Sequence, residues 1–327
     1  MPIPSRITVL SGGVGGARFI QGIQRWASRS GHEVAITVVA NTADDWWIHG
    51  LKVCPDLDTV MYTLGDGIDT ERGWGRQDET WHTKEELAAY GVEPTWFGLG
   101  DRDLATHLVR TQMLDAGYPL SQVTEALCRR WQPGVALLPM TDDRVETHIV
   151  ITDPTDGERR AVHFQEYWVR HRAEVPAHGL VVIGLDQATP GPGVLEAISD
   201  TDLVLLPPSN PVVSIGTITG VPGIADAIRT TSAPVVGVSG IIGGDHVHGM
   251  ARQLLTMAGV EVSAAGVAEH YGVRPAGLLD AWLLDSADAH LLTRIEAAGI
   301  RGFARPLLMS NPDATADIVA AAVDLVS

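Results

Sequence analysis

Apolar and polar positions near the N-terminus follow the pattern of a parallel strand–helix–strand crossover. An apolar run at 7–10 leads into the glycine-rich loop 11–16, and a helical period follows at 19–26. A second apolar run at 34–40 ends in the acidic loop 41–47. Such crossovers are right-handed in nearly all proteins, and ligands bind beyond the carboxyl ends of the strands. We therefore expect the glycine loop and the acidic loop to meet in one cleft.

Helical patterns replace strands in the next part of the chain. They cover 85–90, 103–115 and 121–131, with Ser121 as a candidate N-cap and Gly117 as a stop signal. We interpret residues 66–132, approximately, as a helical insertion folded over the cleft.

Strand patterns return after this insertion. Runs at 135–140, 148–152 and 160–165 are strand-like, and turn residues at 153–157 predict a hairpin between the last two. Short apolar strands covered on both faces are predicted at 180–183, 203–206 and 234–239, and helices near 193–199, 224–229, 249–258, 289–298 and 314–326. The chain thus predicts an α/β fold: a single Rossmann-like, three-layer domain over 1–327, whose mostly parallel sheet is built from both ends of the sequence.

The glycine loop departs from the dinucleotide-binding fingerprint. That fingerprint needs glycine at its first, third and sixth positions; counting from Gly13 the sixth position is Arg18, and counting from Gly12 the third is Val14. A nicotinamide or flavin site is therefore disfavoured, although N–H groups at a helix start still suit an anion. Close packing of a tight turn is the alternative explanation for the glycines.

Carboxylates follow the second predicted strand. Mg²⁺ binds one or two carboxylates together with substrate phosphates, and Asp45, Asp56 and Asp58 are candidates for this role. The alternatives are structural, because Asp58 could N-cap a helix at 59–64 and Asp56 could belong to a turn. The two tryptophans after Asp45 either stack on a flat ring or pack against the insertion.

The stretch 96–107 carries a second set of candidates. Asp101 or Asp103 could cap the helix that follows, and Arg102 could clamp a carboxylate or phosphate with two hydrogen bonds. His107, about one helical turn further on, could assist. A capped helix with no ligand is the alternative.

Polar loops also follow other predicted strands. Ser209 and Asn210 come directly after the strand 203–206 and offer hydrogen bonds to a base, a ribose or a phosphate. The loops 141–143 and 240–244 end further strand-like runs, and His246 and His248 are more typical of solvated loops than of a metal site. No Ser-His-Asp or Cys-His set is legible, so nothing supports a covalent intermediate.

Composition narrows the class of protein. A formal charge of -17 over 327 residues argues against a nucleic-acid backbone or an anionic membrane as main partner. Two distant cysteines indicate no disulfide framework, no leader precedes the first strand, and no apolar run reaches the roughly 20 residues of a membrane span. Only Lys52 and Lys84 are lysines and neither follows a glycine loop, which excludes a Walker-type phosphate site. We expect a soluble cytoplasmic protein.

Taken together and in order, these stretches resemble the 2-phospho-L-lactate transferase family of deazaflavin coenzyme F-420 biosynthesis, and in particular its mycobacterial, phosphoenolpyruvate-type members. The likeness runs from Ile7 to about Gly259, and the matching segments are 11–16, 41–45, 54–59, 99–107, 164–167, 208–211 and 241–244. The family usually has Gly where this chain has Ala43, and fewer aromatic residues after the paired Asp. The arginine-rich, lysine-poor composition is similar to that of a GC-rich actinobacterium.

This resemblance implies a Mg²⁺-dependent transfer. A phosphoenolpyruvyl or 2-phospholactyl group, activated as a diphosphate with guanosine, would pass to the ribityl hydroxyl of the deazaflavin Fo, and GMP would leave. The family also implies a homodimer. The glycine loop and Ser209-Asn210 would hold the guanosine diphosphate, Arg102 the three-carbon carboxylate, and the insertion with its tryptophans would cover the deazaflavin ring.

The expected site residues fall into three sets. The metal set is Asp45, Asp56 and Asp58, and the catalytic set is Asp45, Asp58 and Arg102, one of whose carboxylates would take the ribityl proton. The ligand-binding set comprises Gly12, Gly13, Val14, Gly15, Gly16, Asn41, Thr42, Trp46, Asp101, His107, Ser209, Asn210 and Ser214. The competing hypothesis is a non-enzymatic regulator that binds nucleotide sugars, similar to the gluconeogenesis-factor family, whose Gly-Gly-Ser-Ser after the paired Asp is absent here.

Overall fold

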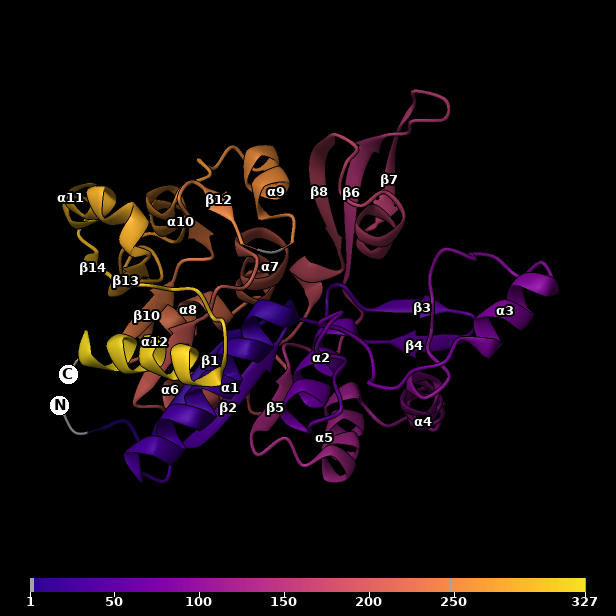
Figure 1. Ribbon diagram of the computed structural model, residues 1–327, viewed down its shortest axis with the longest axis horizontal. Helices are drawn as coiled ribbons and strands as arrows, with labels where there is room; N and C mark the ends of the chain where they lie inside the picture. The colour runs from indigo at the N-terminus through magenta and orange to yellow at the C-terminus, as the bar shows by residue number, and fades with distance from the viewer. Residues whose placement is uncertain (1–2, 248, 327) are drawn as a thin grey trace.

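A seven-stranded, entirely parallel sheet forms the centre of the molecule (Figure 1). The computed structural model describes residues 3–247 and 249–326. Across the sheet the strands are β14 (Arg301–Ala304), β13 (Ala281–Leu284), β10 (Val235–Val238), β9 (Leu203–Leu206), β1 (Arg6–Ser11), β2 (Ala35–Ala40) and β5 (Ala136–Pro139). The strand order reverses between β1 and β9, which is the switch point at which open α/β sheets bind ligands.

Helices cover both faces of this sheet, so the predicted three-layer, Rossmann-like architecture is confirmed. One face carries α1 (Gly13–Ser30), α2 (Pro55–Leu64), α5 (Leu120–Trp131) and α12 (Pro312–Asp324). The other carries α6 (Val194–Ser199), η3 (Pro211–Ile215), α7 (Gly216–Gly220), α8 (Ile224–Thr230), α9 (Ala251–Met257), α10 (Ala264–Tyr271), η4 (Ser286–Leu291) and α11 (Leu292–Ala297).

Neighbouring residues of each central strand enter different cores. In β1, Val9 belongs to the core under α1, whereas Leu10 belongs to the core under η3 and α7. A strand buried on both faces must be apolar at successive positions, which explains the short unbroken hydrophobic runs of the sequence. The two strands nearest the C-terminus, β13 and β14, were not predicted; β14 is exposed or half-buried at every position and so lacks the unbroken apolar run of the other strands.

A separate antiparallel sheet stands beside the central one. This second sheet has the order β7 (Arg159–His163), β6 (Glu146–Thr152), β8 (Ala177–Ile183). The predicted hairpin between β6 and β7 is confirmed, and Gly157 N–H closes its turn on the Asp153 carbonyl. The prediction that 180–183 joins the parallel sheet is wrong, because β8 pairs antiparallel with β6. The short helices η1 (Glu166–Arg170) and η2 (Leu185–Gln187) follow β7 and β8.

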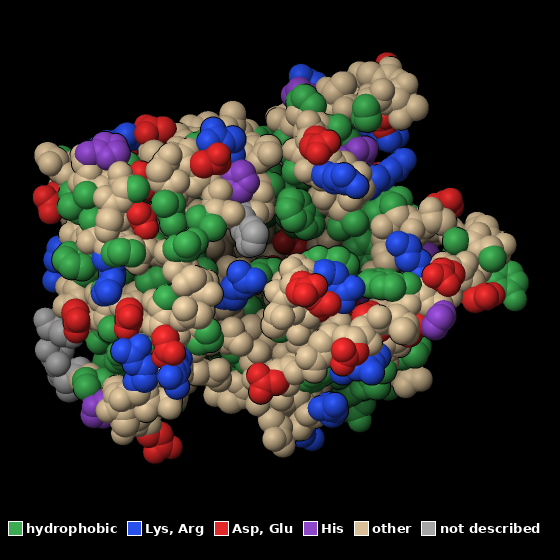
Figure 2. Space-filling model, in the orientation of Figure 1, with side chains coloured by type: hydrophobic (Ala, Val, Ile, Leu, Met, Phe, Trp, Pro, Cys, Tyr) green, Lys and Arg blue, Asp and Glu red, His purple; other side chains and the backbone are tan. Residues whose placement is uncertain are grey.

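A second projection, which we call the arm, lies opposite the second sheet. It consists of the hairpin β3 (Trp46–Ile48) and β4 (Leu51–Val53) with α3 (His82–Ala89) and α4 (Asp103–Asp115). The sequence predicted helices here but not the hairpin. In Figure 1 the arm and the second sheet project from the same end of the molecule, and Figure 2 shows the surface hollowed between them, with hydrophobic side chains along the hollow.

The segment predicted as a helical insertion, 66–132, divides between the arm and the central domain. Helices α3 and α4 belong to the arm, whereas α5 packs beside β5 and contributes Val123 and Leu127 to the core under α1. Ser121 is not the N-cap of α5, because the helix begins at Leu120 after Pro119, and the Ser121 N–H and hydroxyl both donate to Asp142.

The remaining short strands are β11 (Ile241–Ile242) and β12 (Asp245–His246), which form a hairpin after β10. In the described part of the chain no single helix has the length and apolar composition to cross a membrane. The helical segments 211–220 and 224–230 have that length and composition only when they are taken together, and they are bent by 86° relative to one another.

Candidate functional site

The glycine loop lies at the switch point between β1 and β9. Gly13 has a φ of 66°, a left-handed conformation that favours glycine, and its N–H donates to Asp56 Oδ1 at 2.8 Å. The Ser209 hydroxyl bonds both backbone groups of Gly12, accepting from its N–H at 3.1 Å and donating to its carbonyl at 2.8 Å. The expected meeting of the glycine loop with the acidic residues and with the loop after β9 is therefore observed.

Close approach explains most of these glycines. A Cβ on Gly12 would lie 2.5 Å from Ser214 Cβ, and one on Gly15 would lie 2.7 Å from the Pro208 carbonyl oxygen. One on Gly16 would lie within 3 Å of the Ser209 hydroxyl. Packing thus accounts for the glycines themselves, but in the described part of the chain only the first N–H at the positive end of α1, that of Gly13, has a side-chain acceptor, which is Asp56. Within residues 3–247 and 249–326, the N–H groups of Val14 and Gly15 have no acceptor.

Asn41 connects the acids of this edge. Its Nδ2 donates to Asp44 Oδ2 at 3.0 Å, to Asp56 Oδ2 at 2.9 Å and to the Val213 carbonyl at 3.3 Å. Its Oδ1 accepts from the Thr217 hydroxyl at 2.8 Å. Asn41 is fully buried, so its role is to hold Asp44 and Asp56 side by side at the end of β2.

Three carboxylates are buried together at this edge. Asp44, Asp45 and Asp56 are 4%, 1% and 8% exposed. Burial raises the pKa of all three, in Asp44 well above its usual range because the Asp56 charge adds to burial. The pKa of Asp56 rises to about 6, even though the Asn41 and Gly13 donors oppose that shift.

Lys52 is the cation nearest to these acids. Its Nζ lies 3.3 Å from Asp45 Oδ2, and both side chains are almost completely buried. Burial alone would lower the pKa of Lys52, but the Asp45 carboxylate outweighs burial and the pKa lies above its ordinary value. Lys52 thus pairs with Asp45, and among the described residues no ion pair reaches Asp44 or Asp56.

Asp58 belongs to a different charge cluster. Both of its oxygens bind the guanidinium of Arg110, one of them at 3.1 Å, and Arg110 is 1% exposed. Arg110 also contacts His107 Nδ1 at 3.1 Å, and His107 Nε2 lies 3.3 Å from Asp103. Asp58 is not an N-cap, since α2 begins at Pro55. Its pairing with Arg110 joins α2 to α4.

The residues present fit a divalent cation only in part. Among the described residues, no group of three or more His, Cys, Asp or Glu side chains is arranged as a complete metal site. However, Asp44 Oδ1 and Asp45 Oδ1 are buried without a hydrogen-bond donor in that part of the chain, and Asp45 Oδ2 has the Lys52 ammonium 3.3 Å away. Buried polar atoms without partners mark the place of an ion or water. Such a set suits Mg²⁺, which needs few protein ligands when a substrate supplies phosphates.

Trp46 is committed to a column of rings within the protein. Its ring stacks on Trp96 at 5.5 Å on one side and on His163 at 5.1 Å on the other. With both faces covered, Trp46 packs against the rest of the arm, which was the structural alternative at the sequence level. Trp47 has no ring partner among the described residues, and 39% of it is exposed.

Asp101 and Arg102 lie at the start of α4, on the arm. Asp101 accepts from the Thr80 hydroxyl at 2.6 Å and from the N–H groups of His82 and Thr83 at 2.9 Å, so it caps α3. These donors hold its pKa well below the usual range. Arg102 is half exposed and its NH1 lies 3.7 Å from Asp78. The contacts of the described residues therefore give both side chains local partners and do not bring them to the acids.

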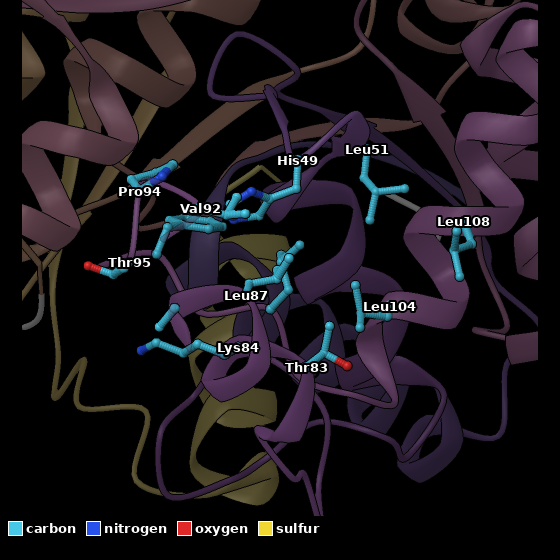
Figure 3. Close-up of a pocket in the computed structure, with 13 residues that line it drawn as sticks. His49, Leu51, Thr83, Lys84, Leu87, Val92, Pro94, Thr95, Leu104 and Leu108 are labelled. Atoms are coloured by element: carbon cyan, nitrogen blue, oxygen red, sulfur yellow. The ribbon is translucent and has the colours of Figure 1, made fainter. Parts of the chain in front are cut away.

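A largely apolar cavity of about 250 Å³ lies inside the arm (Figure 3). Leu51, Leu87 and Leu104 line it, and Lys84 and Thr83 lie at its rim. Since strand residues alternate between faces, Leu51 points away from the face that carries Lys52. The cavity is thus separated by the β3–β4 hairpin from the buried acids.

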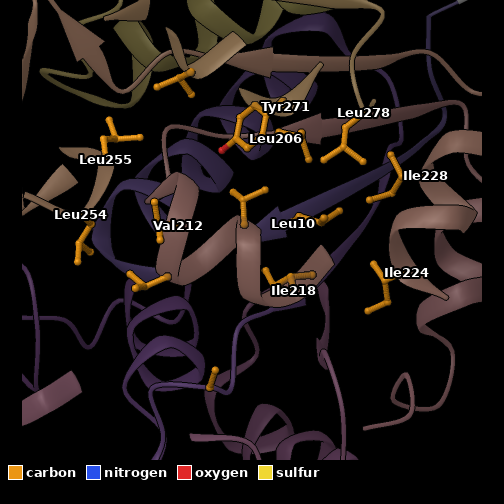
Figure 4. Close-up of a cluster of buried hydrophobic side chains, with 14 of the residues drawn as sticks. Leu10, Leu206, Val212, Ile218, Ile224, Ile228, Leu254, Leu255, Tyr271 and Leu278 are labelled. Carbon is orange, nitrogen blue, oxygen red and sulfur yellow. The ribbon is translucent and has the colours of Figure 1, made fainter. Parts of the chain in front are cut away.

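The loop after β9 is held by its own side chains. Asn210 Oδ1 accepts from the N–H groups of Val212 and Val213 at 2.9 and 3.2 Å, and the Ser209 hydroxyl is used by Gly12. Figure 4 shows Val212 among the buried side chains of the core. Of the predicted ligand-binding residues in this part of the chain, Ser214 places its hydroxyl beside Gly12, whereas Ser209 and Asn210 shape the loop.

Sequence reasoning missed several residues of the site. Asp44 lies in the predicted acidic loop but was given no role there. The residues that were not considered as site candidates at all are Lys52, Arg110, His163 and Gln165. Lys52 carried a signal, since it is one of only two lysines. Asp44 and Gln165 lie in the segments 41–45 and 164–167 that carry the family resemblance, which was a signal for both. Arg110 and His163 gave none, because their importance comes from partners that are distant in sequence. Thr42 is buried at the expected edge, and its hydroxyl has no partner among the described residues.

Comparison with known proteins shows one family. The model of the family "2-phospho-L-lactate transferase CofD" matches residues 7–303. The chain is similar to a phosphoenolpyruvate transferase of Mycolicibacterium smegmatis, with 60% identity over 98% of both chains, and to one of Streptomyces coelicolor, with 62% identity over 98% of both. A crystal structure of a UPF0052 family member from Bacillus halodurans superimposes with a TM-score of 0.61 over 97% of this chain and 98% of that one, at 15% identity, which shows the fold alone.

Proposed function

Because the chain belongs to the 2-phospho-L-lactate transferase family, and is therefore a transferase of coenzyme F-420 biosynthesis, we propose that it forms a phosphodiester on the deazaflavin Fo. The terminal ribityl hydroxyl attacks the phosphorus that carries a three-carbon acid, and GMP leaves. The bond between the ribityl oxygen and this phosphorus forms, the bond between the phosphorus and the bridging oxygen of GMP breaks, and the hydroxyl proton passes to a carboxylate of the site. The observation that carries this proposal is the identity of about 60% to phosphoenolpyruvate transferases over nearly the whole chain.

The donor is the guanosine-diphosphate-activated form of phosphoenolpyruvate. The names of the similar actinobacterial proteins favour it over the phospholactyl donor. No side chain of the site distinguishes the two donors by an evident contact, so both enter the experiment below.

Phosphoryl transfer requires in-line positioning and neutralisation of charge rather than a nucleophilic side chain. The free N–H groups of Val14 and Gly15 at the start of α1 suit the diphosphate. Bound Mg²⁺ would supply electrostatic stabilisation of the phosphate oxygens. Asp44 and Asp45, which keep buried oxygens without a hydrogen-bond donor, would hold it. Of the other two acids that the sequence placed in the metal set, Asp56 would remain hydrogen-bonded to Gly13 and Asn41, and Asp58 would remain paired with Arg110.

One buried carboxylate would take the ribityl proton. Asp56 has the suitable chemistry, because its pKa of about 6 leaves it ionised near neutral pH yet basic enough to accept a proton. On the acceptor side, Trp47 is the exposed aromatic ring of the β3–β4 hairpin, and it lies opposite Lys52 on the face turned to Asp45. If the flat ring of Fo stacked on Trp47, the ribityl side chain of Fo would point towards the acids.

The direct test is product formation. Incubation with Fo, Mg²⁺ and each of the two guanylylated donors, followed by mass spectrometry, should yield the phosphoenolpyruvyl adduct and GMP. Absence of any adduct, together with thermal stabilisation by a UDP-sugar but not by GDP and Fo, would instead support the nucleotide-sugar-binding regulator. By family analogy we also propose a cytoplasmic homodimer, which light scattering on the purified protein and fractionation of cells would check.

A further inference from the structure

The second sheet holds three consecutive carbonyl groups of the acidic loop. Each carbonyl accepts one hydrogen bond: Ala43 from the Thr147 N–H at 2.7 Å, Asp44 from Gln165 Nε2 at 3.3 Å, and Asp45 from His163 Nε2 at 3.2 Å. The loop is therefore attached along its backbone to β6 and to the end of β7, more than a hundred residues away in sequence.

The neighbours of His163 determine which ring nitrogen carries its proton. The Gln165 N–H donates to His163 Nδ1 at 3.1 Å, so Nδ1 is an acceptor and the proton lies on Nε2. That proton points at the Asp45 carbonyl. Stacking against Trp46 fixes the plane of the ring. His163 is thus a directional donor to the backbone of Asp45.

The carboxylates of this loop depend on their backbone for orientation. Among the described residues, Asp44 Oδ1 and Asp45 Oδ1 have no hydrogen-bond donor, whereas Asn41 donates to Asp44 Oδ2 and Lys52 Nζ lies 3.3 Å from Asp45 Oδ2. Further side-chain donors would fix the two Oδ1 atoms but would also occupy them. Holding the carbonyls instead fixes the loop and leaves one oxygen of each carboxylate open to a cation.

We propose that His163 and Gln165 are positioning residues of the transfer reaction, which aim the carboxylates of Asp44 and Asp45 by holding their carbonyl groups. This inference rests on the proposed function and gives the second sheet a part in it. Groups that orient metal-binding residues without touching the metal typically change metal affinity by 10–100-fold when mutated. The same order of effect is expected here.

Four variants separate positioning from packing. His163→Phe keeps a ring against Trp46 but loses the donor, and His163→Gln keeps an amide N–H near the position of Nε2. Gln165→Met keeps the length of the side chain without its amide. His148→Phe is the matched control, because its ring lies 5.4 Å from that of His163 while its Nδ1 reaches only the Glu146 carbonyl, at 3.4 Å.

The measurement is Mn²⁺ binding to the full-length protein in the presence of GDP, followed by electron paramagnetic resonance, with Fo conversion at rising Mg²⁺ as a second readout. His163→Phe and Gln165→Met should weaken Mn²⁺ binding about 10–100-fold and shift the Mg²⁺ requirement upward by the same factor. His163→Gln should recover most of this loss, and His148→Phe should bind like the wild type.

Three results would overturn the proposal. The first is wild-type Mn²⁺ affinity in folded His163→Phe and Gln165→Met proteins, and the second is an equal loss in His148→Phe. A wild-type protein that binds no Mn²⁺ would also overturn it. The proposed transferase function is judged separately, by whether the same wild-type preparation converts Fo.

Discussion

The pair formed by Asp58 and Arg110 provides a quantitative test of the site. Arg110→Met removes the guanidinium while keeping most of the volume of the side chain, and it leaves the Asp58 carboxylate buried without its partner. The side chains of the pair are 7% and 1% exposed, so water cannot replace the lost contacts without a change in structure. Arg110 also donates to the Lys52 carbonyl at 3.3 Å, which loses a donor as well.

Breaking a buried ion pair from one side costs about 3–5 kcal/mol. With an unfolding entropy of about 2.1 cal/mol/K per residue, such a loss lowers the thermal midpoint of a chain of this length by about 4–7 °C. Replacing both partners by apolar side chains of similar volume is often neutral, so Arg110→Met combined with Asp58→Leu should recover most of the loss. Thermal and urea unfolding of the wild type, both single variants and the double variant give the complete cycle.

The same double variant decides the role of Asp58. If Asp58 is structural, the double variant should keep the wild-type Mg²⁺ dependence and most of the turnover. A folded double variant that has lost its response to Mg²⁺ would refute the structural assignment and restore Asp58 to the metal set. A shift of less than about 1 °C in the single Arg110→Met variant would refute the stability reasoning itself.

Asp45→Asn should lower turnover about 100-fold or more and raise the Mg²⁺ requirement, and full turnover with unchanged Mg²⁺ dependence would contradict the metal assignment. Because the pKa of Asp56 is about 6, activity should fall as the pH drops through that value and the Asp56 carboxylate takes up a proton. The Asp56→Asn variant should not show this fall on the acid side of the pH profile. A wild-type rate that stays constant from about pH 5 to 8 would count against Asp56 as the base. Burial lowers the pKa of His163 to about 4, so the unfolded chain binds a proton between about pH 6.5 and 4 that the folded chain does not. The free energy of unfolding should therefore fall by up to about 3 kcal/mol as the pH is lowered through that window. Chemical unfolding of His163→Gln should show a smaller fall over the same pH range. Trp47→Ala should raise the KM for Fo about 2–10-fold, whereas Trp168→Ala, at the same 39% exposure, should leave it unchanged; equal effects would argue against stacking on Trp47.

Elements with a strong local pattern could be predicted from the sequence. The crossover β1–α1–β2 and the β6–β7 hairpin follow from unbroken apolar runs and from turn residues, and the helix at 103–115 has the predicted bounds. The hairpin β3–β4 was missed because three-residue strands are too short for an alternating pattern to emerge. The pairing of β8 was misjudged because an apolar strand does not reveal which sheet it joins.

The site was predictable where it depends on strand ends and not where it depends on partners. Parallel strands bring the glycine loop to Asp56, as expected from the order of elements. By contrast, Arg110 lies 52 positions after Asp58, and no local pattern indicates that the two meet. Likewise, no local sequence pattern indicates that the ring of Trp46 stacks on Trp96 and on His163. Such pairings are decided by tertiary contacts.

The strand order of the central sheet has a consequence for biosynthesis of the chain. Gly12 meets Ser209 across 197 positions, and Asn41 meets Thr217 across 176. A ribosome must therefore translate about two-thirds of the message before Gly12 in the glycine loop can meet Ser209. Until then the first strand waits with one edge unpaired, and a prematurely terminated product would expose that edge to other nascent chains.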